Sequence, residues 1–237
     1  MTIYLHEIHR VVGKREDEFE AAFRDAGGWM DRLGRDDDAR LVWYANQVHG
    51  TGPSYHVVTI TAVEDGAAWE RLARRVHDGD LHDWAHDVDS LRHDVTAKLL
   101  LPVRWSPIGT IDLASVSPEP AAHEPTLFME DTGWPESSLD EYLAFWEDDY
   151  HPMLARQPEA TRLLEIQVCW VTALGAGLRP EAILWQRVHS HQALLGLLTT
   201  EVPAALKGPG SYMAKALEFR DQWRSRLLRT SSWSPRW

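Results

Sequence analysis

The sequence predicts an α+β protein in which one β-α-β-β-α-β unit occurs twice, and three observations support this fold class. Three residues recur at a constant spacing of 122 positions: Phe23, Arg40 and Leu41 return as Phe145, Arg162 and Leu163, and Trp29 is matched by His151 at the same spacing. A second match, Trp105-Ser106-Pro107 with Trp233-Ser234-Pro235, has a spacing of 128 positions. The expected elements also follow the same order in both halves. Insertions in surface loops account for the difference between the two spacings.

The first half is expected to begin with a strand over residues 2–12 and to continue into an amphipathic helix. Between Glu16 and Leu33, apolar residues recur at steps of three and four, the period of a helix with one buried face. Two strands follow near 40–48 and 55–63, separated by turn residues. Asp65 can cap the next helix, and a helical stretch near 80–93 leads to a strand over 98–103.

The second half repeats this order after a linker. Residues 108–124 are rich in Pro, Ser and Ala, a composition typical of a connecting segment. The elements then expected are a strand at 126–130, a helix at 138–156, strands at 162–172 and 182–189, helices near 190–206 and 211–227, and a strand near 228–233. The predicted organisation is a first repeat over 1–107, a linker over 108–124 and a second repeat over 125–237.

The order β-α-β-β-α-β gives an antiparallel sheet that carries its helices on one face. The other face is bare, and two copies can cover each other by packing bare face to bare face. This arrangement encloses a barrel, whose interior is the natural position for a small-molecule cavity. Because one chain supplies both halves, a monomer is sufficient, and a homo-oligomer remains open.

Composition narrows the range of partners. The chain has 237 residues, 44% of them hydrophobic, and a formal net charge of −12. Excess negative charge repels nucleic acid and anionic membranes, so the expected partner is a small hydrophobic or aromatic molecule. Cys169, the single cysteine, lies in an apolar strand and is expected to be a packed thiol. The N-terminus lacks signal-peptide features and no run of 18 apolar residues occurs, which predicts a cytoplasmic protein.

Two segments resemble known families. Residues 3–8 (IYLHEI), followed by Gly13-Lys14 and the helix at Glu18-Phe19, look like the start of a NIPSNAP domain. Residues 143–154 (LAFWEDDYHPML), with Pro158 after them, are similar to the helix-end motif of EthD-like domains. Both families belong to the dimeric α+β-barrel superfamily, so the resemblance implies two ferredoxin-like repeats packed sheet to sheet as a pseudo-dimeric barrel. The chain departs from the EthD pattern, which often has one residue between His and Pro.

The resemblance assigns a role to His151 alone, because the corresponding histidine of EthD-like enzymes is regarded as a proton-transfer residue. An imidazole titrates near neutral pH and can exchange a proton with a bound carbonyl or enol without a cofactor. The first half has Trp29 at the matching position, which indicates one working site and one degenerate, structural half. A helix-end histidine can also simply cap its helix, where positive charge is favourable, and this alternative stays open.

Strand periodicity suggests which side chains of the second half line the barrel. In the strand 162–172, alternation turns the polar residues toward the interior and the apolar residues toward the helices. The polar set is Glu165, Gln167 and Cys169, and the apolar set is Leu164, Ile166 and Val168. Glu165 is therefore the second catalytic candidate.

Substrate contacts are expected from matching faces of the other strands. The candidates are Gln167, Arg187, Trp185, Trp43, His56, His6 and Tyr4. In the first strand, His6 and Tyr4 share one face, whereas Glu7 and His9 share the other, so the four cannot serve one site. For each candidate, exposure to solvent at a strand edge is the alternative.

A metal site is not expected. His82 and His86 lie one helical turn apart, with His77 and His93 nearby, as helical metal ligands require. The surrounding aspartates, however, mark a solvated face, and no third ligand has a defined spacing.

The sequence favours a cofactor-independent enzyme that acts by proton transfer on a small apolar or aromatic carbonyl compound in the barrel cavity. A cyclase, isomerase, dehydratase or lyase would fit, and related barrels also include cofactor-free monooxygenases. Two alternatives remain, a haem-binding member of the same superfamily and a non-catalytic small-molecule-binding barrel. A fold alone does not choose between them, because one architecture supports many chemistries.

Overall fold

The computed structural model describes residues 1–136, 138–174, 179–204 and 207–237, and its centre is one closed barrel. The strands are β1 (Ile3–Val11), β2 (Ala39–Gln47), β3 (His56–Val63), β4 (Arg92–Pro102), β5 (Leu127–Trp134), β6 (Leu164–Leu174), β7 (Ala182–Val188) and β8 (Gln222–Thr230). The α-helices are α1 (Glu16–Arg24), α2 (Trp29–Leu33), α3 (Gly66–Asp78), α4 (His82–Asp89), α5 (Leu139–Phe145), α6 (His151–Ala155), α7 (His191–Thr199) and α8 (Tyr212–Ala216). A π-helical turn, Trp146–Tyr150, joins α5 to α6.

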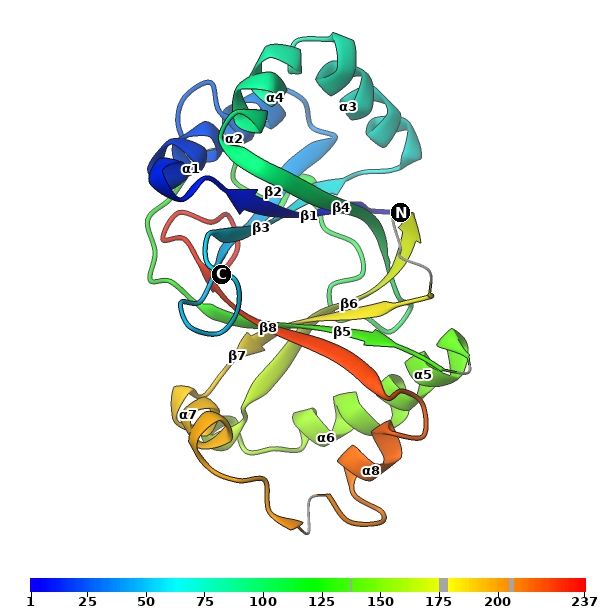
Figure 1. Cartoon of the computed structure of the whole chain (residues 1–237). Helices are drawn as coiled ribbons and strands as arrows, with labels where there is room; N and C mark the ends of the chain where they lie inside the picture. Colours follow the sequence, from blue (N-terminus) through cyan, green and yellow to red (C-terminus); the bar gives the residue numbers. More distant parts are fainter. Residues whose placement is uncertain (137, 175–178, 205–206) are drawn as a thin grey trace.

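Two lobes stack with their sheets face to face and their helices on the outside (Figure 1). Around the barrel the strand order is β1-β3-β2-β8-β5-β7-β6-β4. Antiparallel pairs β2/β8 and β4/β6 join the sheet of the first lobe to that of the second. The predicted fold class is confirmed: the chain is α+β, with two ferredoxin-like repeats packed sheet to sheet as a pseudo-dimeric α+β barrel.

Several element boundaries differ from those expected. The helix expected over 16–33 is interrupted at Gly27, which has a positive φ of 80° that L-residues rarely adopt, so α1 and α2 are separate. The helical stretches expected near 80–93 and 211–227 are shorter in the structure than expected. The strands that follow them, β4 and β8, begin earlier in the chain, where they pair with β1 and β5. None of the described helices has the length and hydropathy needed to cross a bilayer.

Aromatic side chains from both lobes fill the barrel interior. Trp43, Trp170 and Trp185 are almost completely buried, and Trp43 lies 5.6 Å from Trp185 and 6.3 Å from Trp170 between ring centroids. Phe128 stacks on Trp185 at 5.1 Å, and Tyr4 lies 5.3 Å from Trp170. The expectation of an open ligand cavity inside the barrel is therefore wrong, because these rings pack against one another there.

The segment between the repeats contributes to the same core. Ile111, Leu113 and Val116 are buried and pack into the barrel cluster. The backbone N–H of Ile111 also donates to the Thr2 hydroxyl at 3.4 Å, next to the start of β1. Residues 108–124 thus connect the repeats and also bury apolar surface against both of them.

Two buried carboxylates of the second lobe bind basic side chains of the first. Glu130 lies 2.7 Å from the His6 imidazole and is also bonded to Arg226 of its own lobe. Glu181 lies 2.5 Å from Lys98. Burial alone would raise the pKa of Glu130, but the His6 and Arg226 charges and hydrogen bonds lower it to about 2. Because each of these buried carboxylates is paired with a basic side chain, both can lie between the two lobes, where little water is present.

A β-bulge in each lobe determines which side chains face the barrel. The pairing shifts between Leu41 and Trp43 in β2, and between Ile166 and Val168 in β6. An extra residue reverses the alternation beyond it. Val168 consequently lies in the barrel core and Cys169 in the helix-facing core, the opposite of the sequence expectation. Ile166 faces the helices as expected.

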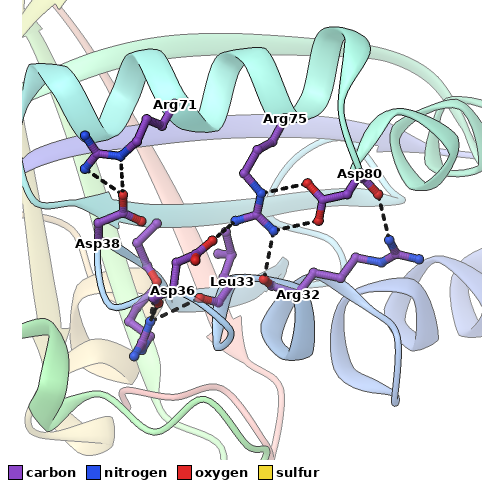
Figure 2. A network of polar contacts seen from close by, with 9 residues as sticks. Arg32, Leu33, Asp36, Asp38, Arg71, Arg75 and Asp80 are labelled. Carbon is purple, nitrogen blue, oxygen red and sulfur yellow. Dashed lines mark hydrogen bonds and ion pairs between the residues drawn. The ribbon is translucent and has the colours of Figure 1, made fainter.

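A network of arginines and aspartates holds α3 against the segment that precedes β2 (Figure 2). Arg75 binds Asp80 at 2.8 Å, Asp36 at 2.6 Å and the carbonyl oxygen of Arg32 at 3.2 Å. Asp80 in turn accepts from Arg32 through its backbone oxygen at 3.0 Å. The network positions α3, one wall of the pocket described next.

Candidate functional site

An aromatic pocket lies in the first lobe, between the outer face of its sheet and helices α1 to α4. It has a volume of about 280 Å³, and we call it the first-lobe pocket. Its apolar walls are Leu5, Phe23, Trp29, Trp69, Leu72, Ala73, Val76, Trp84, Ala85 and Ala97. Its polar lining consists of Glu7, His9 and Arg92. Small-molecule sites typically combine apolar walls with a few convergent polar groups, so this pocket is the candidate site.

The polar groups converge because of strand geometry. Glu7 and His9 are two residues apart on β1 and therefore project from the same face. Arg92 begins β4, the neighbour of β1, where it is paired with Val11. The face opposite to the barrel interior thus presents a carboxylate, an imidazole and a guanidinium to one space.

Hydrogen bonding determines the tautomer of His9. Arg92 Nη1 lies 2.7 Å from His9 Nδ1, and a guanidinium can only donate, so Nδ1 accepts. The proton of the neutral ring is therefore on Nε2, which donates to the Thr59 hydroxyl at 2.9 Å. Burial, with the nearby positive charges of Arg92 and His6, holds the pKa of His9 well below its usual value. His9 is thus a neutral, fixed support for Arg92.

Glu7 is the group in the pocket that is suited to proton transfer. Burial raises the pKa of its carboxyl above the usual value, while Arg92, His6 and a hydrogen bond with Thr59 lower it in part. A carboxyl with a raised pKa is a stronger base than an ordinary glutamate, which favours proton abstraction from a substrate. Arg92 binds Asp89 at the pocket edge, with Nε to Oδ1 at 2.9 Å, which fixes the guanidinium beside the cavity.

Two stacked indoles form the aromatic wall. Trp29 and Trp84 have ring centroids 4.5 Å apart and planes inclined by 18°. Trp29 donates its N–H to the Thr61 hydroxyl at 3.0 Å, and Trp84 donates to the Ala22 carbonyl at 2.8 Å. Both rings are therefore held in fixed orientations, as a wall for a flat ligand requires.

Contacts show that Tyr150, and not His151, occupies the position of Trp29 in the second lobe. In the first lobe Trp84 contacts Phe23 edge to face and stacks on Trp29, and in the second lobe Tyr212 stacks on both Phe145 and Tyr150, so the trio Phe23, Trp84 and Trp29 corresponds to Phe145, Tyr212 and Tyr150. The strand partners correspond as well, since Trp29 binds Thr61 and Tyr150 binds Gln186 at 2.8 Å. The alignment of Trp29 with His151 is therefore shifted by one residue. A match of short sequence segments cannot reveal such a shift.

His151 lies in the outer helical layer of the second lobe. It is the first residue of α6, is half-buried, and its ring stacks on Trp105 with centroids 5.7 Å apart. It does not line the first-lobe pocket. Its proposed catalytic role remains a prediction.

The other predicted site residues fall into two groups, neither of which contains His151. Tyr4, His6, Trp43 and Trp185 are buried in the barrel interior, so the structure does bring these four together. The second group is less buried: Glu165 is paired in register with Arg187, His56 is half-buried in β3, and Gln167 lies at the β6 bulge. Glu165 also lies 3.9 Å from His189. Their roles in substrate contact stay predictions.

The pocket residues do not fit haem. An axial histidine needs a free imidazole nitrogen, and both nitrogens of His9 are occupied, by Arg92 and by Thr59. In the second lobe, Tyr142, Trp146 and Tyr150 fill the corresponding layer. Among the residues that the structure describes, no three His, Cys, Asp or Glu side chains form a group that could hold a metal ion, and this includes the α4 histidines.

Sequence reasoning missed the residues of this pocket. Periodicity places Glu7 and His9 together on the face opposite to the barrel, but it does not show that Arg92 joins them. One signal was available: the helices of the first half carry three tryptophans, Trp29, Trp69 and Trp84.

No family model matches the sequence, and no curated protein does. Solved structures match over almost the whole chain. An anthrone oxidase-like protein has a TM-score of 0.60 at 10% identity, covering 97% of this chain and 91% of that one. A candidate monooxygenase from Lactobacillus acidophilus NCFM has 0.54 at 8%, covering 98% and 97%. A chlorite dismutase from Candidatus Nitrospira defluvii has 0.51 at 7%, covering 97% and 91%.

These similarities concern the fold, since each identity is far below that of close relatives. Each covers both lobes of the chain, in agreement with the strand order of the closed barrel. The chain is therefore a tandem member of the dimeric α+β-barrel fold.

Proposed function

We propose that the protein is a cofactor-independent enzyme that transfers a proton on a small aromatic carbonyl compound bound in the first-lobe pocket. Glu7 is the general base, Arg92 binds the oxygen on which negative charge develops, and the indoles hold the aromatic body. One observation carries the proposal: a half-buried carboxyl with a raised pKa and a fixed guanidinium face the same aromatic pocket.

The chemical step needs only these groups and the substrate. The Glu7 carboxylate takes a proton from a carbon that is next to the carbonyl or conjugated with it, and the C–H electron pair is delocalised onto the carbonyl oxygen. The resulting enolate oxygen is stabilised by the Arg92 guanidinium in a site with little water. Return of the proton to carbon or oxygen completes an isomerisation or hydrogen exchange. Where O₂ is the co-substrate, as a monooxygenase-type subclass would require, it adds to the deprotonated carbon. For anthrone, one oxygen atom then becomes the new ketone oxygen and the other leaves as water with the two methylene hydrogens.

The experiment uses anthrone as the probe, because one similar structure is an anthrone oxidase-like protein and anthrone has an acidic methylene that is conjugated with its ketone through the aromatic rings. Exchange of its methylene hydrogens in D₂O is followed by NMR without oxygen, and anthraquinone formation is followed in air. We expect the protein to accelerate exchange. We expect Glu7→Gln to slow it about 10²–10⁴-fold, the usual effect of losing a general base.

Two matched variants determine the location of the chemistry. His151→Ala removes the base predicted for the second lobe and is expected to retain exchange activity. Arg92→Gln, which can still hydrogen-bond to His9, is expected to slow exchange less than Glu7→Gln does. Loss of activity in His151→Ala with full activity in Glu7→Gln would move the site to the second lobe. Absence of any acceleration with anthrone and with 1-tetralone would contradict the proposed reaction.

A further inference from the structure

A second pocket lies in the other lobe, on the side of the barrel away from the proposed active site. It has a volume of about 490 Å³, and we call it the second-lobe pocket. It is lined by the end of β5, by α8 and by the start of β8: Trp134, Met213, Ala216, Leu217, Arg220, Asp221, Gln222, Trp223 and Arg224. None of these residues belongs to the first-lobe pocket.

Two guanidinium groups in this pocket lie over indole rings. Arg220 Cζ is 4.0 Å from the Trp223 ring centroid, and Arg224 Cζ is 5.5 Å from that of Trp134. Neither arginine forms an ion pair with a carboxylate among the residues that the structure describes. A cation held over an aromatic face can offer its remaining N–H groups to an anion. Arg224 is exposed and offers them directly, whereas Arg220 also interacts with the Tyr142 and Tyr212 hydroxyls.

Arg220 has an unsatisfied donor. The residue is only 6% exposed, and its buried Nε has no hydrogen-bond partner. Buried donors are almost always satisfied in folded proteins. Because this nitrogen is enclosed by protein atoms, a ligand oxygen would approach the other N–H groups of Arg220, which lines the pocket.

The pseudo-symmetry of the barrel makes the feature more specific. Arg220 occupies in the second lobe the position that Arg92 occupies in the first. Arg220 lies two residues before Gln222 and Arg92 lies two residues before Asp94, and Gln222 and Asp94 hold matching places in the strand pairing of the two lobes. Arg92 forms an ion pair with Asp89, whereas Arg220 forms no ion pair among the described residues and interacts with the Asp131 carboxyl only at longer range. The duplicated position has thus kept its arginine and lost the direct ion pair.

The rim of the pocket is apolar and exposed. Leu217 is 63% exposed, Trp223 45% and Met213 37%. Exposed apolar side chains that gather around a cavity indicate a binding surface rather than chance. Asp221 also lines the pocket and is exposed, and its charge disfavours an anionic group placed beside it.

We propose that the second-lobe pocket binds an amphipathic carboxylate. Its carboxylate would accept from Arg220 and Arg224, and its apolar chain would lie on Leu217, Met213 and Trp223. The chemistry requires both parts, because the arginines select the charge and the rim selects the apolar body. The site is separate from the proposed active site, so either proposal can fail without the other.

The test is isothermal titration calorimetry with octanoate at low ionic strength, compared with octanamide, which has the same chain and no charge. Octanoate is expected to bind and octanamide to bind at least tenfold more weakly. Arg224→Gln and Leu217→Ser change exposed residues and are each expected to weaken octanoate binding about tenfold, the loss of one charged hydrogen bond or a similar apolar contact.

Two controls keep the result specific. Arg74→Gln removes the same charge from an exposed position on α3 and is expected to leave octanoate binding unchanged. Glu7→Gln is expected to leave it unchanged as well. Equal affinity for octanoate and octanamide, binding by Arg224→Gln at the wild-type level, or no binding of octanoate at all would each overturn the proposal.

Discussion

Burial and neighbouring charges change the pKa of the Glu7 carboxyl in opposite directions. Burial raises its pKa, and the positive charge of Arg92 limits the rise. The base of the proposed reaction is the ionised form, so protonation removes activity. This balance sets the pH range in which the pocket can act.

The rate of anthrone exchange is expected to rise with pH through a value above 4.5, the ordinary pKa of a glutamate, as Glu7 loses its proton. The measurement is the exchange rate between about pH 4 and pH 8, where the wild-type curve should show this inflection. In Glu7→Gln the inflection should be absent. An unchanged pH profile in that variant would assign the titration to another group.

His9 predicts a stability effect of defined sign. Its pKa in the folded protein lies well below the usual 6.5, so below about that pH the unfolded chain binds a proton that the folded chain does not. Stability therefore falls as the pH decreases from 6.5. Urea unfolding at several pH values should show this loss in the wild type and a smaller loss in His9→Gln. If the free energy of unfolding changes equally with pH in both proteins, His9 does not cause the loss of stability.

Among the elements, α3 depends on the arginine–aspartate network more than on its exposed ion pairs. Arg75 is 20% exposed and makes several bonds, whereas Arg74 is 75% exposed and binds Glu70 within its own helix. Arg75→Ala is expected to lower the free energy of unfolding by about 1–2 kcal/mol, after allowance for partial solvent screening. Arg74→Ala should cost at most about 0.5 kcal/mol. Thermal melts of the two variants measure the difference.

Helix α2 presents Trp29 both to the core and to the first-lobe pocket. Trp29→Ala is expected to cost about 3–5 kcal/mol, because a buried ring and its bond to Thr61 are lost. At temperatures well below the melting temperature of the variant, Trp29→Ala should also exchange anthrone hydrogens more slowly than the wild type, since the pocket loses a wall. Trp29→Phe, which keeps a ring, is the control and should retain more of both. A loss of activity that only follows unfolding would support a purely structural first half.

At the scale of the whole molecule, the described strands close on themselves and leave no free edge. The segment between the repeats strengthens this closure through Leu113. Leu113→Ala is expected to destabilise the protein by about 2–5 kcal/mol, whereas Leu195→Ala, at a position 60% exposed, should be nearly neutral. Chemical unfolding of both variants tests the point. Equal stabilities would mean that the segment is a passive linker.

Much of the architecture could be predicted because it depends on local patterns. The 122- and 128-residue recurrences and the repeated order of elements indicate two similar units, and an antiparallel sheet with one bare face must be covered. Strand ends were less predictable, because β4 and β8 extend as far as their partners β1 and β5 allow. That length is a property of the pair and not of either segment.

The candidate site was predicted less well, for three physical reasons. The β6 bulge reverses the alternation after Ile166, so Val168 and Cys169 exchange faces. Large rings occupy the barrel interior, so the cavity lies between sheet and helices instead. Glu7 and Arg92 are 85 positions apart in the chain and meet only because β1 pairs with β4.

The sequence by itself determined the duplicated α+β architecture, the separation of Glu7 and His9 from Tyr4 and His6, and the apolar character of the core. These features follow from periodicity along one strand or helix, which short segments encode. Only the tertiary structure decided which face of the sheet holds a pocket and which arginine joins the carboxyl. Those outcomes depend on strand register and on how side chains fill space, and both arise from contacts between segments distant in the chain.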